Sequence, residues 1–126
     1  VKRNLQSLVV AQAAVTALVS AFGSEMLKLE LRDLPTGYEA YLVIPLSNKE
    51  AKRETCRIED THPLGRLFDL DVIDSDGVPV SRESIGLSPR KCLVCDNEAR
   101  FCMRNRTHTL AELSAKIDEM IEAYVR

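Results

Sequence analysis

The chain has 126 residues, of which 45% are hydrophobic and 29% are charged, a composition typical of one soluble globular domain. Its net charge of −2 argues against a protein that binds nucleic acid over its whole surface. No apolar run reaches the roughly 18 residues of a membrane span, and the first residues do not form a signal peptide. We therefore expect a cytoplasmic protein with reduced cysteines that binds neither nucleic acid nor a membrane.

The first predicted element is a helix from Val1 to Phe22, where apolar residues recur at helical spacing. It ends at Gly23, a residue type that often follows the last turn of a helix. No Ser, Thr, Asp or Asn is found before this helix as an N-cap, and the chain does not begin with Met. We therefore expect that an N-terminal segment of the native protein is missing here.

A hairpin and a polar helix are predicted next. Residues 26–34 alternate leucines with charged side chains, residues 38–45 alternate again, and Pro35–Gly37 lies between them as a turn. The polar stretch 49–60 is compatible with a helix capped by Ser47 or Asn48, and its composition predicts that it lies against solvent.

A half-buried strand is predicted from Arg66 to Ile73, after the chain breaks at His62–Pro63. A tight turn at Asp74–Gly77 leads into a short return strand at 78–80. Residues 81–89 read as a loop.

Two helices complete the predicted chain. One runs from about Pro89 to Arg104 and carries most of the cysteines on one face. The other is strongly amphipathic and starts at a capping box formed by Thr109 and Glu112. The whole order predicts a single α+β domain over 1–126. With one more strand before the first helix, it becomes a ferredoxin-like split β-α-β core with C-terminal helices.

Asp69 and Asp71 are the first candidate site residues. Residues two apart on a strand point to the same face, so the two carboxylates repel unless a cation lies between them. Mg²⁺ suits such a pair, because it binds carboxylates and substrate phosphates together. Gly65 and Arg66 just before them suit a phosphate. The alternative is an acidic pair on the wet face of a hairpin.

Three stretches together resemble a known family: "HPLGRLFDLDV" at 62–72, "SR" at 81–82 and "RKCLVCDNEARFCMRNRTH" at 90–108. They are similar to the apo-citrate lyase phosphoribosyl-dephospho-CoA transferases, also called citrate lyase holo-acyl-carrier-protein synthases. The resemblance covers nearly the whole chain, although members of the family are longer at the N-terminus. The pattern G-R-L-x-D-x-D of the family falls on Gly65, Arg66, Leu67, Asp69 and Asp71.

The resemblance implies a transfer reaction. The donor is 2'-(5''-triphosphoribosyl)-3'-dephospho-CoA, the acceptor is a serine on the acyl-carrier subunit of citrate lyase, and pyrophosphate leaves. Asp69 and Asp71 are then expected to hold Mg²⁺ against the triphosphate. A third carboxylate often assists such chemistry, and the candidates are Glu39, Asp74 and Asp76. His62 is a candidate for accepting the serine proton, or it is a surface residue that ends a helix.

Residues 81–108 form a basic segment with six positive and three negative side chains, a local charge of +3. A basic patch beside an acidic pair suits a phosphate-rich donor. We expect Arg90 and Arg104, which match the family pattern, to contact phosphates. Arg100 reads as part of a solvated helix face.

Cys92, Cys95, Cys102 and His108 have the side chains that zinc prefers, although their spacing differs from that of common zinc fingers. The alternative is that the three cysteines are small apolar residues packed on the buried face of a helix, against Leu113 and Ile117 of the last helix. The zinc interpretation also leaves open another function, a small zinc-stabilised protein-binding module without catalysis.

Overall fold

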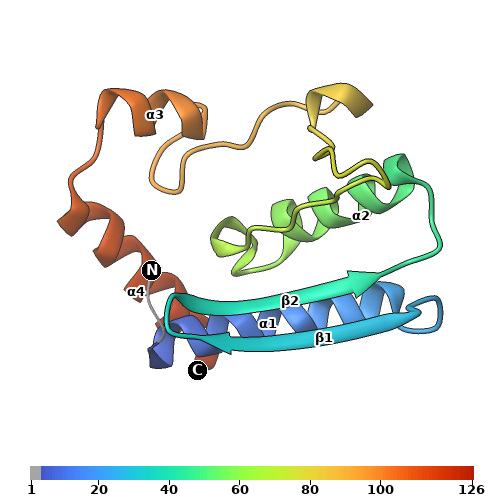
Figure 1. Cartoon of the computed structure of the whole chain (residues 1–126). Coiled ribbons are helices and arrows are strands. Elements are labelled where there is room, and N and C mark those ends of the chain that lie inside the picture. The colour runs from blue at the N-terminus through green and yellow to red at the C-terminus, as the bar shows by residue number, and fades with distance from the viewer. Residues whose placement is uncertain (1–3) are drawn as a thin grey trace.

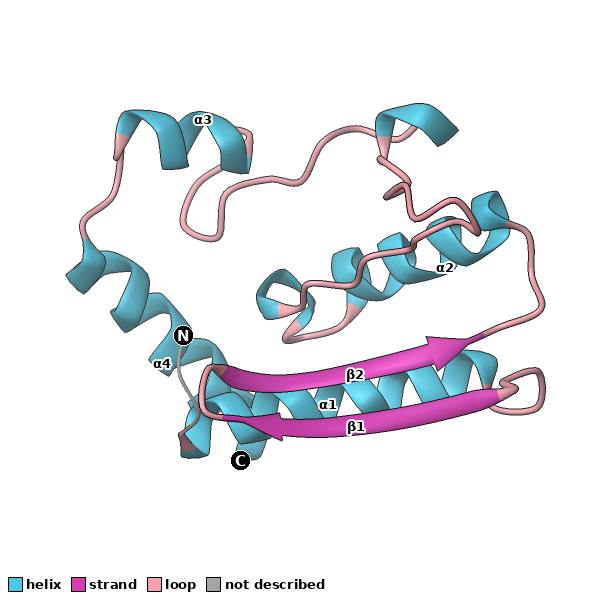
Figure 2. Cartoon of the chain, viewed as in Figure 1, coloured by secondary structure: helices cyan, strands magenta, loops and turns pink. Residues whose placement is uncertain are grey.

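The computed structural model describes residues 4–126 and has an α+β architecture, with a two-stranded antiparallel sheet and helices (Figures 1 and 2). The elements in chain order are α1 (Leu5–Phe22), β1 (Lys28–Leu34), β2 (Gly37–Val43), α2 (Asn48–Thr61), the 3₁₀ turns η1 (Gly65–Leu67) and η2 (Glu83–Ile85), α3 (Ala99–Asn105) and α4 (Leu110–Val125). The predicted fold class is confirmed. The ferredoxin-like split core is not seen, because the sheet of the described residues has only the strands β1 and β2.

α1 begins with an N-cap that the sequence analysis missed. The side chain of Asn4 accepts a hydrogen bond from Ser7 N–H (2.8 Å), and the Asn4 N–H donates to Ser7 Oγ (2.7 Å). This capping box starts the helix at Leu5, so the expectation of an uncapped helix was wrong. Val1–Arg3, the first part of the predicted helix, lie outside the described residues.

α1 also corrects the expectation that no segment is apolar enough for a membrane. It is 18 residues long with a mean hydropathy of 1.7, which satisfies the length and composition of a membrane span. A core helix of a soluble protein meets the same criteria. In this structure Ala13, Leu18 and Phe22 are buried in the core, and α1 contacts β2, α2 and α4.

The predicted hairpin is confirmed, with Lys28 opposite Val43 and Leu34 opposite Gly37. The hairpin lies along α1 (Figure 1). Leu42 of the inner strand packs against the core. Leu31 of β1 and Leu27 just before the strand are 61% and 70% exposed, so the leucine side of β1 is largely uncovered in this structure.

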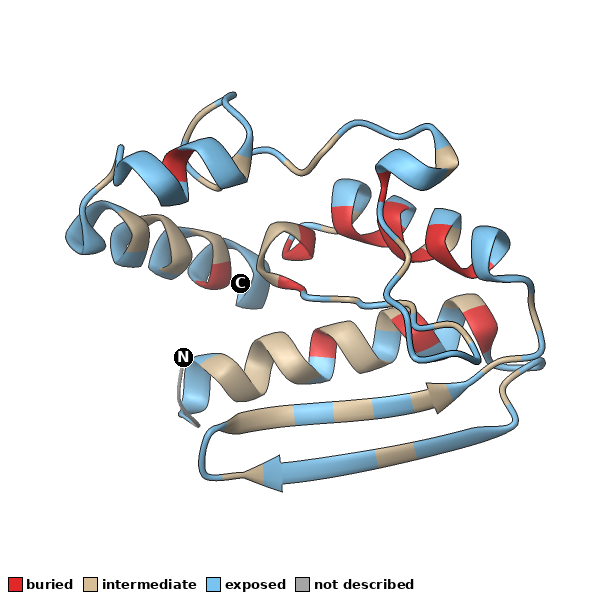
Figure 3. Cartoon of the chain, turned by 45° about the horizontal axis from the view of Figure 1, so that its top comes forward, coloured by how far each residue is buried: buried red, intermediate tan, exposed pale blue. Residues whose placement is uncertain are grey.

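The composition of α2 predicted a helix that lies against solvent, but the structure buries one of its sides. Ser47 caps it as predicted, and His62–Pro63 ends it. One side of α2 is buried, however, and contains both apolar and charged residues (red in Figure 3): Ala51, Lys52, Thr55, Cys56, Ile58 and Glu59. The polar composition misled because two of these buried positions, Lys52 and Glu59, are charged.

The chain between α2 and α3 is less regular than predicted. The expected strand from Arg66 to Ile73 is replaced by η1 and an extended segment, which pairs with the return segment only near the isolated bridge Ile73–Pro79. The expected helix from Pro89 to Arg104 is reduced to α3. Residues 90–98 instead form a loop whose ends are joined by the isolated bridge Lys91–Glu98. The predicted turn at 74–77 is present, and Gly77 has a φ of +81°.

The core lies where α1, α2, α4 and the turn after α2 meet. Its buried members include Phe22 of α1, Ile58 of α2 and Ile121 of α4, with Leu64 and Phe68 on either side of η1. The amphipathic α4 starts at the capping box of Thr109 and Glu112, as predicted. The core therefore fixes the start of the extended segment that carries the two aspartates, and it anchors α4.

Candidate active site and metal centre

Gly65 is required by close packing against α2. A Cβ atom at this position would lie 2.2 Å from the carbonyl oxygen of Glu59 and 2.6 Å from that of Ile58. No side chain fits at such distances from backbone. The structure thus explains this glycine through the path of the chain, whereas the sequence analysis assigned it to phosphate binding.

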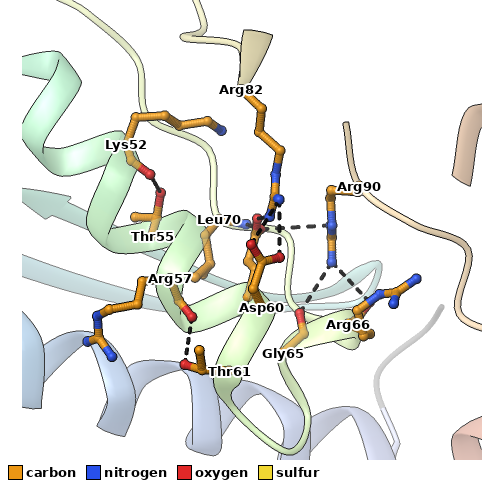
Figure 4. Close-up of polar contacts among 11 residues, drawn as sticks. Lys52, Thr55, Arg57, Asp60, Thr61, Gly65, Arg66, Leu70, Arg82 and Arg90 are labelled. Carbon is orange, nitrogen blue, oxygen red and sulfur yellow. Dashed lines mark hydrogen bonds and ion pairs between the residues drawn. The ribbon is translucent and has the colours of Figure 1, made fainter. Parts of the chain in front are cut away.

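Glu59 makes several polar contacts beside η1, and its partners Leu70, Arg82 and Arg90 are labelled in Figure 4. Its side chain is only 4% exposed. One carboxylate oxygen accepts a hydrogen bond from Arg82 Nη2 (2.8 Å), and the other accepts one from the backbone N–H of Leu70 (3.0 Å). Arg90 Nη1 lies 3.8 Å from Glu59 Oε2. Glu59 therefore joins α2, the extended segment and two arginines from the basic segment.

Arg82 is buried with Glu59, and it also donates to Asp60 at 3.1 and 3.3 Å. Burial opposes its charge, but the hydrogen bond to Glu59, the neighbouring Cys56 and the hydrogen bond to Asp60 outweigh it and hold the pKa of Arg82 above its ordinary value. No role was predicted from the sequence for Arg82 or Glu59. A signal was present for each: Arg82 lies in the family pattern, and Glu59 follows Cys56 at helical spacing on the buried side of α2.

Arg90 and Arg66 meet at η1. Arg90 Nη2 donates to the carbonyl oxygens of Gly65 (3.2 Å) and Arg66 (3.0 Å). Within residues 4–126, Arg66 Nη2 is the one buried side-chain nitrogen or oxygen without a hydrogen-bond partner. Both arginines line a pocket of about 420 Å³, whose walls are Asp60, Arg66, Arg82, Leu87, Ser88, Pro89, Arg90 and Lys91.

This pocket has a net positive lining, with four cationic side chains against one carboxylate. Asp60 already accepts two hydrogen bonds from Arg82, so its charge is partly compensated. A pocket lined by four cationic side chains, one of them Arg66 with its unpartnered buried nitrogen, is suited to a phosphate or another oxyanion. We call these residues the arginine pocket.

Asp69 and Asp71 follow η1 on the extended segment, and both are exposed while Leu70 and Val72 between and after them are half-buried. The alternation expected of a strand therefore persists without the strand. Within residues 4–126 neither carboxylate has a hydrogen bond or an ion pair. Their exposure leaves both free to bind a cation from solvent.

The candidates for a third carboxylate are not gathered around this pair. Glu39 lies on β2 and accepts a hydrogen bond from the Tyr41 hydroxyl (2.7 Å). Asp74 accepts the N–H groups of Asp76 and Val78 and so shapes the turn. Among residues 4–126, no carboxylate belongs to a group of three or more side chains arranged to hold a metal ion.

His62 is engaged in the fold. Its Nδ1 accepts a hydrogen bond from Leu64 N–H (2.9 Å), and its ring centroid lies 4.9 Å from that of Phe68 and 5.5 Å from that of Tyr124. Burial lowers the pKa of His62. Acting as a base through Nδ1 would require this hydrogen bond to break, so the surroundings favour a structural role at the end of α2.

Arg104 lies apart from the arginine pocket. It is exposed in the last turn of α3 and is not among the residues that line the pocket. Arg100 is exposed on the same helix and pairs with Glu83 at 3.2 Å, which fits the solvated face expected for it.

Cys92, Cys95, Cys102 and His108 come together in one cluster. Their ligand atoms all lie within 4.8 Å of one another. Cys95 Sγ is 3.5 Å from Cys102 Sγ and 3.3 Å from His108 Nε2. In a tetrahedral zinc site, with Zn–S near 2.3 Å, two ligand atoms lie roughly 3.5–3.8 Å apart. The cluster therefore matches the size of such a centre, and it could bind a metal ion.

The cluster is assembled from three separate segments, which excludes the predicted packing of the cysteines along one helix. Cys92 and Cys95 lie in the loop 90–98, Cys102 is on α3, and His108 directly precedes the N-cap of α4. Because the cysteine spacing of three and seven residues also suits a helix, the sequence favoured the wrong local structure.

Hydrogen bonding favours the thiolate, the form that binds a metal, at Cys95 and Cys92 but not at Cys102. The hydrogen bond from His108 lowers the pKa of Cys95 to about 7, and the same bond raises the pKa of His108. Burial opposes ionisation of Cys92, yet the backbone N–H groups of Val94 and Cys95 lower its pKa. Burial raises the pKa of Cys102. Behind the cluster, His108 Nδ1 lies 3.7 Å from Glu112 Oε2, as is common for a histidine that binds metal.

Comparison with known proteins decides which family contains this site. The sequence profile of the family described as apo-citrate lyase phosphoribosyl-dephospho-CoA transferase matches residues 1–124. The chain belongs to this family. The resemblance seen in the sequence is thus confirmed over nearly the full length, and the family is one of transferases that make the holo-acyl-carrier protein of citrate lyase.

Similar proteins carry the same description. A probable apo-citrate lyase phosphoribosyl-dephospho-CoA transferase of Vibrio cholerae is 41% identical over 128 residues, which cover 98% of this chain and 72% of that protein. One from Streptococcus pyogenes is 36% identical, over 87% of this chain and 59% of that protein. The relatives are therefore longer than this chain. Membership of a transferase family does not support the alternative of a non-catalytic zinc module.

Proposed function

We propose that this chain attaches the phosphoribosyl-dephospho-CoA group to a serine of the citrate lyase acyl-carrier subunit. The serine oxygen attacks the phosphorus nearest the ribose of the triphosphoribosyl donor. The bond from that phosphorus to the bridging oxygen breaks, pyrophosphate leaves with the electron pair, and the hydroxyl proton passes to solvent. Family membership supports the reaction, and the arginine pocket supports the place where the donor binds.

The observation that carries this assignment is the unpartnered Nη2 of Arg66. An unsatisfied buried guanidinium nitrogen is costly, and a phosphate oxygen of the donor would satisfy it. Arg90 supports the same backbone turn from the other side through the carbonyl groups of Gly65 and Arg66. Arginines that are already buried or hydrogen-bonded lose little conformational freedom when they bind a ligand. The pocket is therefore suited to hold the triphosphate in place while pyrophosphate leaves.

Asp69 and Asp71 are proposed to bind Mg²⁺ next to this pocket. They directly follow η1, which carries Arg66, and both carboxylates are exposed and uncompensated. Mg²⁺ prefers one or two carboxylates together with substrate phosphates. When bound, the ion would neutralise charge on the triphosphate and on the leaving pyrophosphate.

Zinc is the metal proposed for the Cys₃His cluster. Three thiols and an imidazole at tetrahedral spacing are the ligand set of structural zinc sites. Four protein ligands leave no open position for a substrate, so a structural role is proposed. A thiol-rich metal centre and a fourth free cysteine, Cys56, suit a reducing compartment, which supports the expected cytoplasmic location.

A further strand beside the hairpin is proposed for the complete ferredoxin-like core. β1 and β2 are both edge strands, and the leucine side of β1 is open. The relatives have additional length from which such a strand could come. A structure of a full-length relative tests this arrangement.

The function is tested by incubating the protein with apo-carrier, triphosphoribosyl donor and Mg²⁺, and by measuring the mass gained by the carrier. Arg66→Ala is expected to raise the KM for the donor at least tenfold while carrier binding is unchanged. Arg100→Ala is the matched control, because Arg100 is exposed and paired with Glu83. Loss of carrier binding in Arg66→Ala, with unchanged donor dependence, would move Arg66 from the donor site to the protein–protein surface.

A further inference from the structure

The loop 90–98 connects the two sites described above. Its base is closed by Ala99 N–H donating to the carbonyl oxygen of Arg90 (2.9 Å), and Cys92 N–H donates to that of Asn97 (2.7 Å). Arg90 and Lys91 of this loop line the arginine pocket. Further along the same loop, Cys92 and Cys95 belong to the Cys₃His cluster. A single covalent bond separates Lys91 of the pocket from Cys92 of the cluster.

The remaining ligands tie this loop to the core. His108 directly precedes the N-cap of α4, and α4 packs into the core through Ile121, with Ile117 and Met120 against it. Cys102 adds α3 to the same centre. A metal ion in the cluster therefore connects the core, through α4 and His108, to Cys92 and hence to Arg90.

Outside the cluster, the loop is attached to the body of the protein through the side chain of Arg90. Its Nη2 donates to the carbonyl oxygens of Gly65 (3.2 Å) and Arg66 (3.0 Å), its Nη1 lies 3.8 Å from Glu59 Oε2, and 29% of the side chain is exposed. The pair of Arg100 and Glu83 lies on the surface, where ion pairs contribute little. Without a metal, the cluster itself is held by contacts between sulfur atoms and by the bond of Cys95 with His108, which are weak crosslinks.

We propose that the Cys₃His metal centre is a positioning device that holds Arg90 and Lys91 at the arginine pocket, so that metal occupancy controls the affinity for a polyphosphate. The proposal rests on the proposed function for the identity of the pocket. It extends that function, because the affinity for the donor then depends on a closed metal site that does not touch the substrate. The residues of the cluster are positioning residues, and the contacts to phosphate are made by the arginines.

The coupling must be reciprocal: if the metal strengthens polyphosphate binding, polyphosphate must strengthen metal retention by the same factor. This allows a test on the intact zinc-loaded protein. Inorganic triphosphate is the probe, and zinc release to a chromogenic chelator is followed with and without it. We expect saturating triphosphate to slow zinc loss at least tenfold, and stripped protein to bind triphosphate at least tenfold more weakly.

Two variants serve as controls. Arg90→Ala/Lys91→Ala is expected to keep one zinc per chain but to lose the protection by triphosphate. Cys56→Ala, which removes the buried cysteine outside the cluster, should keep both zinc and protection. Hydrogen exchange of stripped protein should show lost protection in 90–108 and retained protection in α1 and α2.

The outcomes separate the proposals. If zinc binds but triphosphate does not change its release, the positioning role is overturned and the transferase function stands. If the zinc-loaded protein does not bind triphosphate at all, the assignment of the arginine pocket to the donor is overturned. Absence of stoichiometric zinc, or unfolding of α1 and α2 on its removal, would overturn the idea that the metal acts on the loop.

Discussion

At the scale of single residues, the aspartate pair is the sharpest test of the proposed chemistry. We expect Asp69→Asn and Asp71→Asn each to lower the transfer rate by about 10²–10³-fold, a loss typical of transition-state charge stabilisation. Stability should not fall, because both side chains are exposed and unpaired within residues 4–126. The carrier mass assay and a thermal melt measure the two quantities. Asp76→Asn, in the exposed turn, is the control, and near wild-type transfer by both variants would contradict the magnesium site.

Glu59 is expected to be needed for stability, although it lies beside the pocket. Glu59→Ala leaves Arg82, which is only 8% exposed, without its main partner. Removing one partner of a buried ion pair costs about 3–5 kcal/mol of unfolding free energy. Glu54→Ala, which breaks the exposed pair with Arg57, should cost about 1 kcal/mol or less. Urea unfolding measures both, and equal losses would show that the buried pair contributes no more than a surface one.

The lowered pKa of His62 is expected to make the stability of the protein depend on pH. Burial lowers the pKa of folded His62, so the unfolded chain takes up a proton first as the pH falls. Its stabilising contribution is therefore complete above about pH 6.5, the pKa of an unfolded histidine, and is lost as the pH falls toward the lower pKa of the folded protein. His62→Asn keeps an acceptor for Leu64 N–H without a titrating group.

The measurement is the urea midpoint at pH 7.5 and at pH 5.5. The loss of stability between these pH values should be smaller in His62→Asn than in the wild type, whatever the variant loses in ring packing against Phe68 and Tyr124. His108 titrates in both proteins and cancels from the comparison. An equal or larger loss in the variant would exclude His62 as the source of the pH dependence.

At the scale of elements, the turn η1 depends on how closely it approaches α2. Gly65→Ala places a Cβ within 2.2 Å of the Glu59 carbonyl oxygen, so η1 must move away from the helix. We expect a loss of stability of about 2–4 kcal/mol, in the range of overpacking and strain, together with a higher KM for the donor. Gly86→Ala is the contrast: its φ of +81° is strained, but no atom lies within 4 Å of the new Cβ, so the cost should be about 1 kcal/mol. A milder effect at Gly65 than at Gly86 would contradict the close packing.

At the scale of the whole molecule, the uncovered side of the hairpin predicts self-association. Exposed leucines on an edge strand combine an apolar patch with unpaired backbone groups. Leu31→Lys is expected to lower the concentration-dependent mass measured by sedimentation, with little change in melting temperature because Leu31 is 61% exposed. Val78→Lys changes an exposed residue of the 74–80 turn and should leave association unchanged. Equal association of the wild type and Leu31→Lys would show that this edge does not mediate self-association.

The local elements could be predicted from the sequence because each depends on neighbouring residues. The hairpin follows from alternation, α4 from its capping box and apolar stripe, and the end of α2 from His62–Pro63. The family and its transferase chemistry were also readable, because the pattern around Gly65 and Asp69 is short and continuous in the chain. Where a local pattern fits two structures, the sequence favoured the wrong one. The cysteines have a spacing that suits a helix, but most of the predicted helix is a loop.

The tertiary structure decided which distant residues meet. Glu59 and Arg82 are 23 residues apart in the chain, and their burial as a pair depends on how η2 folds over α2. The cysteine cluster needs a loop, α3 and the start of α4 to converge, and the burial of the unpartnered Arg66 nitrogen depends on the residues packed around it. Periodicity reports only which side of an element is apolar, whereas contacts between charged or metal-binding side chains depend on the packing of elements that the chain separates.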